Sequence, residues 1–239
     1  MSDQERSEYG DPIYRHDRRE GEFEPASGNE GAIEQISDHI EEFVGPISNV
    51  FHEIVSDLVH LDVHMVPPTG KRKYHTLVTS GMSDRPMKAP AGQEGKEFAE
   101  VMICLPPDWK LSQTAFEKER WYWPIRWLKT LARLPHEYNT WLWEGHTVPN
   151  GDPPEPFADN TELCCAYLLR PALFPKEFFK LPASKRKTIR FFCLVPLYTD
   201  EVDFKLKHGS GALIDRLDDA GVTELLDIER PSICRRRSR

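Results

Sequence analysis

One stretch of the sequence has the spacing of metal ligands. His60, Asp62 and His64 alternate with apolar residues, so an extended chain would place all three on one side of a strand. Imidazole and carboxylate groups are ligands for zinc. The polar face of any half-buried strand shows the same spacing, which makes it weak evidence for a metal. We therefore interpret these residues as a solvated strand face or a sheet edge, and keep a metal site as the alternative.

A second set of residues could supply an acid and a base. His75, Asp84, His146 and Asp159 lie at the ends of predicted elements, where distant parts of a chain can meet. Nothing in their spacing requires that they do. The sequence has no Gly-x-Ser-x-Gly elbow, no Walker loop and no Gly-x-Gly-x-x-Gly. We expect no catalytic residue, cofactor or metal, and the alternative function is a hydrolase or metal-dependent enzyme that uses His75, Asp84 and His146.

The five cysteines are expected to be structural. Four of them lie inside apolar runs and read as small buried hydrophobes in a reducing compartment: Cys104, Cys164, Cys165 and Cys193. The vicinal pair would point to opposite faces of a strand. No Cys-x-x-Cys pair is present, so a zinc ribbon is not expected.

The stretch from Tyr74 to Asp84 begins as a strand and ends as a turn. Five of its first six residues are β-branched, aromatic or apolar, which suits a half-buried strand. Ser80-Gly81 interrupts this run, and the polar residues that follow favour a turn. The strand thus brings glycine, serine and aspartate to one end of a sheet.

Hydrophobic periodicity predicts the remaining elements. Alternating or continuous apolar runs indicate strands over 59–65, 97–105, 163–169 and 189–198, with a short one at 225–228. Helical spacing indicates helices over 32–43 and 48–57, a long helix from Pro124 that breaks near Pro135, a short helix from Thr199 and another over 210–220. We interpret the segments 145–156 and 171–187 as irregular connections. This order predicts an α/β (α+β) fold with a mixed sheet packed against helices.

Composition limits the class of protein. The 239 residues, 39% of them hydrophobic, suffice for one large domain or two small ones. The net charge of -8 argues against a general nucleic-acid binder. No run of about 18 apolar residues predicts a membrane span, and the N-terminus lacks the apolar core of a secretory signal, so we expect a cytoplasmic protein. We predict a disordered acidic tail over 1–31, a domain over 32–233 and a solvated basic tail over 234–239.

Several separated blocks resemble the suppressor of fused family. Residues 74–84, Tyr-His-Thr-Leu-Val-Thr-Ser-Gly-Met-Ser-Asp, look like its signature strand. Further similar blocks follow in the family's order at 98–105, 123–133, 145–147, 189–201 and 213–228, so the resemblance covers about residues 43–233. It implies a suppressor-of-fused-like single domain with an α/β fold that binds proteins and has no catalytic residues.

The resemblance also implies a kind of partner. The two-domain animal members clamp a peptide between their domains, whereas this chain resembles the first domain alone. Single-domain members look like bacterial proteins, many of which are proposed immunity proteins. We therefore expect a non-enzymatic immunity-type or regulatory binder of a partner protein, with neither specific nucleic acid nor membrane as partner. An acidic surface suits a basic toxin. The expected contact residues are Ser80, Gly81, Ser83, Asp84, Arg85, Gly145, His146, Thr147 and Asn150. A structural domain that self-associates through a sheet edge is a further alternative.

Overall fold

The computed structural model describes residues 5–17, 19–53 and 55–235. In this part of the chain one mixed sheet holds the strands in the order β1-β2-β3-β4-β8-β6-β5, with β7 paired to β8 beside that path. Neighbouring strands are antiparallel, except that β4 and β8 run parallel. The strands are β1 (Asn49–Phe51), β2 (Asp62–Val66), β3 (His75–Ser80), β4 (Ala99–Leu105), β5 (Thr147–Pro149), β6 (Cys165–Leu169), β7 (Lys180–Ser184) and β8 (Lys187–Leu197). This confirms the predicted α+β fold with a mixed sheet.

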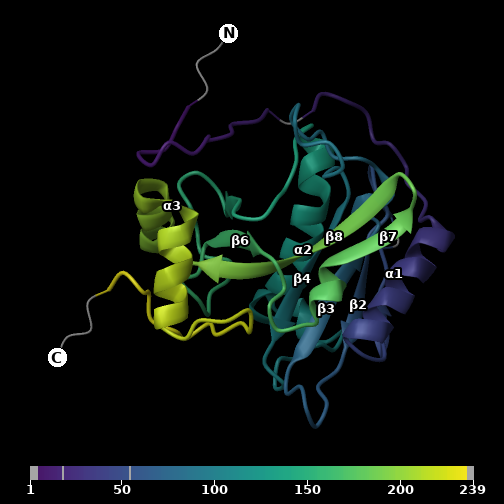
Figure 1. Cartoon of the computed structure of the whole chain (residues 1–239). Helices are drawn as coiled ribbons and strands as arrows, with labels where there is room; N and C mark the ends of the chain where they lie inside the picture. Colours follow the sequence, from purple (N-terminus) through teal and green to yellow (C-terminus); the bar gives the residue numbers. More distant parts are fainter. Residues whose placement is uncertain (1–4, 18, 54, 236–239) are drawn as a thin grey trace.

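Helices cover both faces of the sheet (Figure 1). Strand side chains alternate between the faces, and β4 is buried at every position, as a central strand must be. On one face α2 (Glu119–Glu137) packs its tryptophans Trp123 and Trp127 against apolar residues of β3, β4 and β8. On the other face lie α1 (Glu30–Phe43) and, toward β6, α3 (Thr199–Asp219). The tryptophans of α2 thus form a core against one face of the sheet.

Local sequence signals account for the ends of α1. The Asn29 side chain accepts a hydrogen bond from the Ala32 N–H at 3.2 Å and caps the N-terminus. The helix stops before Gly45, whose φ of +137° lies where glycine is favoured. Ile36 and Ile40, one turn apart, are buried against the sheet.

The predicted helix over 48–57 is wrong. Residues 49–51 form the short edge strand β1, where Val50 pairs with His64 of β2, and the chain from His52 onward is irregular. Ile54 lies outside the described residues. A helical spacing of apolar residues was present, but main-chain pairing with β2 overrode it, and β-branched Val50 is well suited to a strand.

The predicted break at Pro135 is also wrong, because α2 continues through Pro124 and Pro135 to Glu137. Pro135 lies in the last turn, so only a short piece of helix follows it, and its ring is buried in the core. The predicted separation near residue 210 corresponds to a kink in α3, where Gly209 adopts φ +85° and ψ +165°.

Two short strands were not predicted, and the predicted strand at 225–228 is reduced to a single bridge. β5 and β7 lie in the predicted loops, and β7 is an exposed edge strand with Pro182 in it. In the predicted last strand, Leu225 forms a parallel bridge with Cys104 at the end of β4. Such short pairings leave little periodicity to detect in the sequence.

The described N-terminal residues lie along the surface of the domain. Figure 1 shows them as a purple trace that passes α3, crosses above α2 and descends to α1. The domain boundaries at 31 and 233 stay a prediction, and residues 236–239 of the predicted basic tail are outside the described part. Among the described residues, no helix combines the length and the apolar character that a membrane crossing needs.

Candidate protein-binding site

The turn after β3 is held by a buried carboxylate. Gly81 has φ +106°, and an added Cβ would lie 1.8 Å from the His60 carbonyl oxygen. Glu100 of β4, which is 0% exposed, accepts hydrogen bonds from the N–H groups of Gly81 at 3.1 Å and Ser83 at 2.9 Å. The Thr79 hydroxyl donates to its other oxygen at 2.6 Å. Burial raises the pKa of Glu100 to about 7.

The predicted contact residues of this turn divide into two groups. Ser80, Gly81 and Ser83 are buried, and Ser80 shares a 2.8 Å hydrogen bond with His64, so these residues shape the turn from inside. Asp84 and Arg85 are partly exposed and lie at the surface. Asp84 accepts from the Asn29 N–H at 3.3 Å, burial raises its pKa, and Arg85 pairs with Glu24.

The proposed acid–base set is not assembled. His75 lies at the start of β3 and contacts the Pro107 carbonyl oxygen at 3.2 Å. Asp84 follows the other end of that six-residue strand, which is roughly 17 Å long at about 3.3 Å per residue. His146 lies beside β5, beyond β4, β8 and β6 in the sheet order. These residues cannot act on one substrate atom in this arrangement.

His60, Asp62 and His64 do not meet as three metal ligands either. Asp62 contacts the rings of His52 at 2.9 Å and His60 at 3.4 Å. The His64 ring instead faces Ser80. The buried Asp62 carboxylate thus serves to hold two histidines at the edge where β2 begins.

Among the described residues, one other group has ligand atoms close enough to hold a metal. The thiols of Cys104 and Cys193 and the Glu224 carboxylate lie within 4.8 Å of one another. The Glu224 oxygens already accept from the N–H groups of Ala172 and Leu173. Hydrogen bonding to Cys104 and burial raise the pKa of the Cys193 thiol, which disfavours the thiolate a metal needs. We interpret the group as part of the core.

The second predicted contact region packs against α3. The Gly145 N–H donates to the Leu168 carbonyl at 2.8 Å, and a Cβ on Gly145 would lie 3.3 Å from the Ser210 hydroxyl oxygen. Thr147 pairs with Tyr167, so it belongs to the sheet. The Asn150 amide donates to the carbonyls of Glu155 and Pro156 at 2.8 and 2.9 Å and thereby shapes the loop after β5. The two predicted regions are thus separate, at β3 and at β5.

Residues near the kink of α3 are what sequence reasoning missed. Lys205 is only 6% exposed, its ammonium lies 6.0 Å from the centre of the Tyr167 ring, and none of the described residues accepts a hydrogen bond from it. Burial lowers the pKa of Lys205. Burial and the nearby Lys205 charge lower the pKa of His146 to about 4. The available signal was Gly209 inside a helical pattern, since an isolated helix glycine often has a packing reason.

The N-terminal residues bridge the two regions. Residues 19–29, the anchor segment, pair with the chain at 56–58: Pro25 bridges Asp57, and the Ala26 N–H donates to the Ser56 carbonyl at 3.1 Å. Residues 5–17, the hook, fold back on themselves through an Arg6–Pro12 bridge. The hook then reaches α3 at Leu206, where its Tyr9 N–H donates to the carbonyl at 3.0 Å.

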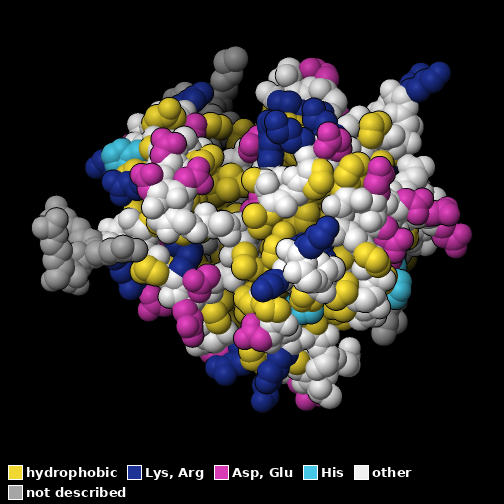
Figure 2. All heavy atoms as spheres, turned by 60° about the horizontal axis from the view of Figure 1, so that its bottom comes forward, with side chains coloured by type: hydrophobic (Ala, Val, Ile, Leu, Met, Phe, Trp, Pro, Cys, Tyr) yellow, Lys and Arg dark blue, Asp and Glu magenta, His cyan; other side chains and the backbone are white. Residues whose placement is uncertain are grey.

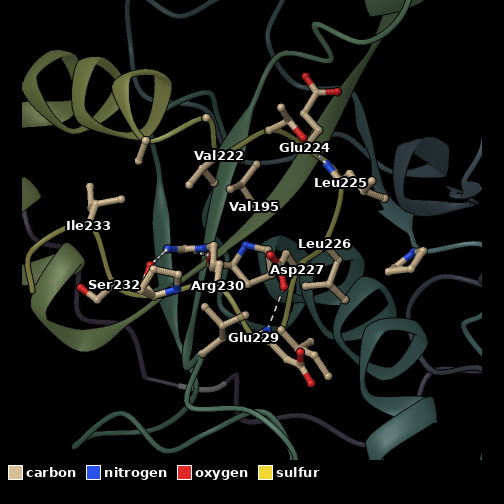
Figure 3. Close-up of a pocket in the computed structure, with 18 of the residues that line it drawn as sticks. Val195, Val222, Glu224, Leu225, Leu226, Asp227, Glu229, Arg230, Ser232 and Ile233 are labelled. Carbon is tan, nitrogen blue, oxygen red and sulfur yellow. Dashed lines mark hydrogen bonds between the residues drawn. The ribbon is translucent and has the colours of Figure 1, made fainter. Parts of the chain in front are cut away.

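A separate crevice opens outside the carboxyl ends of β4 and β8. These strands part beyond the pairing of Met102 with Cys193, and the segment 222–233 lines the gap (Figure 3). Its volume is about 1080 Å³. Figure 2 shows hydrophobic side chains gathered around a hollow on the lower face of the molecule. The carboxyl ends of parallel strands are where α/β sheets bind ligands, so this crevice is a second candidate.

The guanidinium in this crevice is already engaged. Arg230 binds both carboxylate oxygens of buried Glu201 at 2.6 Å and donates to the Pro196 carbonyl at 2.9 Å. Glu201 also accepts from the N–H groups of Tyr198 and Ile233, both at 3.0 Å. The pair fastens the C-terminal segment to α3 and leaves the guanidinium little capacity for an anionic ligand.

The family follows from comparison with known proteins. The family model for suppressor of fused protein (SUFU) matches residues 57–231, which is more than half of the chain. The chain therefore belongs to the suppressor of fused family, as its sequence blocks indicated. No curated protein matches it.

Solved structures share the fold at low sequence identity. A suppressor of fused homologue from Neisseria gonorrhoeae is 20% identical with a TM-score of 0.65, over 87% of this chain and 100% of that one. A chain of the Sufu–Fu complex is 13% identical with a TM-score of 0.59, over 88% and 93%. A structure of Drosophila Suppressor of Fused is 12% identical with a TM-score of 0.56, over 89% of this chain and 52% of that one.

Proposed function

We propose that this chain is a non-enzymatic protein-binding module whose binding face joins the surface of Asp84 and Arg85 to the β5–α3 region around His146. One observation carries the proposal: the chain's own N-terminal residues already lie along this face as extended polypeptide, joined to it by main-chain hydrogen bonds. A surface that satisfies the main chain of one peptide segment has the donors and acceptors to bind another. The Sufu–Fu complex supports a protein as the partner.

Capture of a partner tests this proposal directly. The tagged full-length chain is used as bait in a lysate of its source cell, beside two single variants. R85A removes a partly exposed cation of the proposed face, whereas K71A removes an exposed cation in the segment before β3, at the opposite end of that strand from Asp84 and Arg85. We expect a partner retained by wild type and K71A and diminished by R85A. Retention by all three chains, or by none, would contradict the proposal.

We further propose an immunity-type or regulatory role toward a basic partner in the cytoplasm. The net charge of -8 supports this, because a negative protein attracts a positive one over long range and accelerates their association. The partner should then associate faster as salt is lowered. An association rate that does not change between about 20 and 300 mM salt, where screening changes greatly, would argue against a basic partner.

The product of the adjacent gene distinguishes an immunity role from a regulatory role. Co-expression with a toxin encoded next to it should restore growth of the host cell if the role is immunity. Binding to a neighbouring protein without any rescue would favour regulation.

A further inference from the structure

We propose that the hook is a tethered competitor for part of the binding face, and that the partner presents there an extended segment with an aromatic residue followed closely by a carboxylate. This inference rests on the proposed function and specifies its ligand. In the chain without its partner, Tyr9 and Asp11 of the hook take the place of the partner's aromatic residue and carboxylate.

The kink of α3 forms the place for the aromatic group. Gly209 interrupts the helical geometry. In the turn before it, the Leu206 carbonyl oxygen accepts a hydrogen bond from the Tyr9 N–H. A Cβ on Gly209 would lie 2.6 Å from the Tyr9 ring, so the ring rests directly on the helix backbone. A glycine that exposes backbone in mid-helix is costly unless something packs on it, and here an aromatic ring does.

Beside it lies a place for the carboxylate. Lys205 is 6% exposed, and its ammonium donates to none of the described residues, so its donors remain available to an anion. Burial lowers the pKa of Lys205, and the negative charge of Asp11 acts in the opposite direction. His146, whose low pKa keeps it uncharged near neutral pH, does not compete for that anion. A carboxylate of the partner would supply the direct ion pair that Lys205 lacks among the described residues.

The hook is weakly held, as a displaceable segment must be. Tyr9 remains 60% exposed and Tyr14 40% exposed, although both are large apolar groups. The Tyr14 ring lies 6.2 Å from the His146 ring, and the Arg15–Asp152 ion pair joins two exposed side chains. Exposed ion pairs contribute little, and segments with few buried contacts open readily. The anchor segment is better secured by its pairing with 56–58.

A labelled synthetic peptide of residues 5–17 tests the inference by fluorescence anisotropy with the full-length chain. In wild type the tethered hook occupies the site at an effective concentration on the order of millimolar, so the peptide should bind weakly. Y9A and D11N in the chain loosen the hook, and each should tighten peptide binding roughly tenfold. E20Q is the matched control, because it removes the same charge from an exposed residue and should bind as wild type does. A peptide carrying D11N should bind the Y9A chain roughly tenfold more weakly than the unmodified peptide does.

The results separate this inference from the proposed function. Equal peptide binding by wild type, Y9A and E20Q, or no binding by any of them, overturns the inference. The expected peptide binding without a captured partner would show that the site accepts such a segment, and would remove the proposed function. A captured partner whose affinity for Y9A equals that for wild type would remove the inference alone.

Discussion

Replacing Glu100 by glutamine should remove a specific pH dependence of stability. The carboxyl has a pKa of about 7 in the folded protein against 4.5 for the unperturbed group. Between these values the folded state holds a proton that the unfolded state has lost. Folding is therefore less favoured as pH rises from about 4.5 to 7, and beyond pH 7 the ionised, buried group imposes its full penalty. A difference of 2.5 pH units at 1.36 kcal/mol each gives about 3 kcal/mol.

The geometry allows glutamine to replace the protonated acid. Its amide oxygen can accept from the N–H groups of Gly81 and Ser83, as the carboxylate does. Its amide N–H can donate to the Thr79 hydroxyl oxygen, while that hydroxyl turns to the Val101 carbonyl oxygen at 3.2 Å. Each group that contacts the Glu100 carboxylate keeps a partner, so E100Q should fold.

Urea unfolding of wild type and E100Q at a series of pH values from 4 to 8.5 measures the effect. The free energy of unfolding of E100Q minus that of wild type should rise by about 3 kcal/mol between pH 4.5 and 8. Taking the difference cancels the histidines, which titrate in both proteins. The exposed E34Q change controls for the loss of one negative charge and should give a flat difference. A flat difference for E100Q as well would refute the reasoning.

Three more measurements test other parts of the structure. G81A should destabilise the fold by roughly 2–4 kcal/mol, because the added Cβ would overlap the His60 backbone. G92A, also at positive φ but in open space, should cost about 1 kcal/mol. Similar losses of stability for the two variants in thermal denaturation would contradict this. R230M should cost about 3–5 kcal/mol in urea unfolding by leaving the Glu201 carboxylate buried and unpaired, and a loss under about 1 kcal/mol would show that the pair is solvated. His146 should stay uncharged in NMR titration until pH falls toward 4; because the unfolded ring takes up its proton near 6.5, stability should fall as pH drops between these values, and a transition near 6.5 in the folded protein would contradict burial.

How much of the candidate site was predictable depends on the range of the interactions that make it. The strand and turn from Tyr74 to Asp84 were visible, because β-branched residues and turn chemistry are local signals. The burial of Ser80, Gly81 and Ser83 could not be predicted, because it depends on contacts with Glu100 of the next strand. Lys205 gave no signal, since a lysine in an amphipathic helix is ordinarily solvated and only the packing of α3 against β6 buries it. The helix expected over 48–57 failed for the same reason, because pairing with β2 is not a local property.

The sequence by itself determined the mixed-sheet fold class, most of the longer elements and the family, since these follow from hydrophobic period, turn residues and the order of blocks. It did not decide which side chains meet. Only the tertiary structure separated His75 from Asp84 by the length of β3, and only it brought the Tyr9 ring onto Gly209 from 200 positions away along the chain. Contacts between residues so distant in sequence depend on how whole elements pack, and that packing leaves no trace in the local spacing of residues.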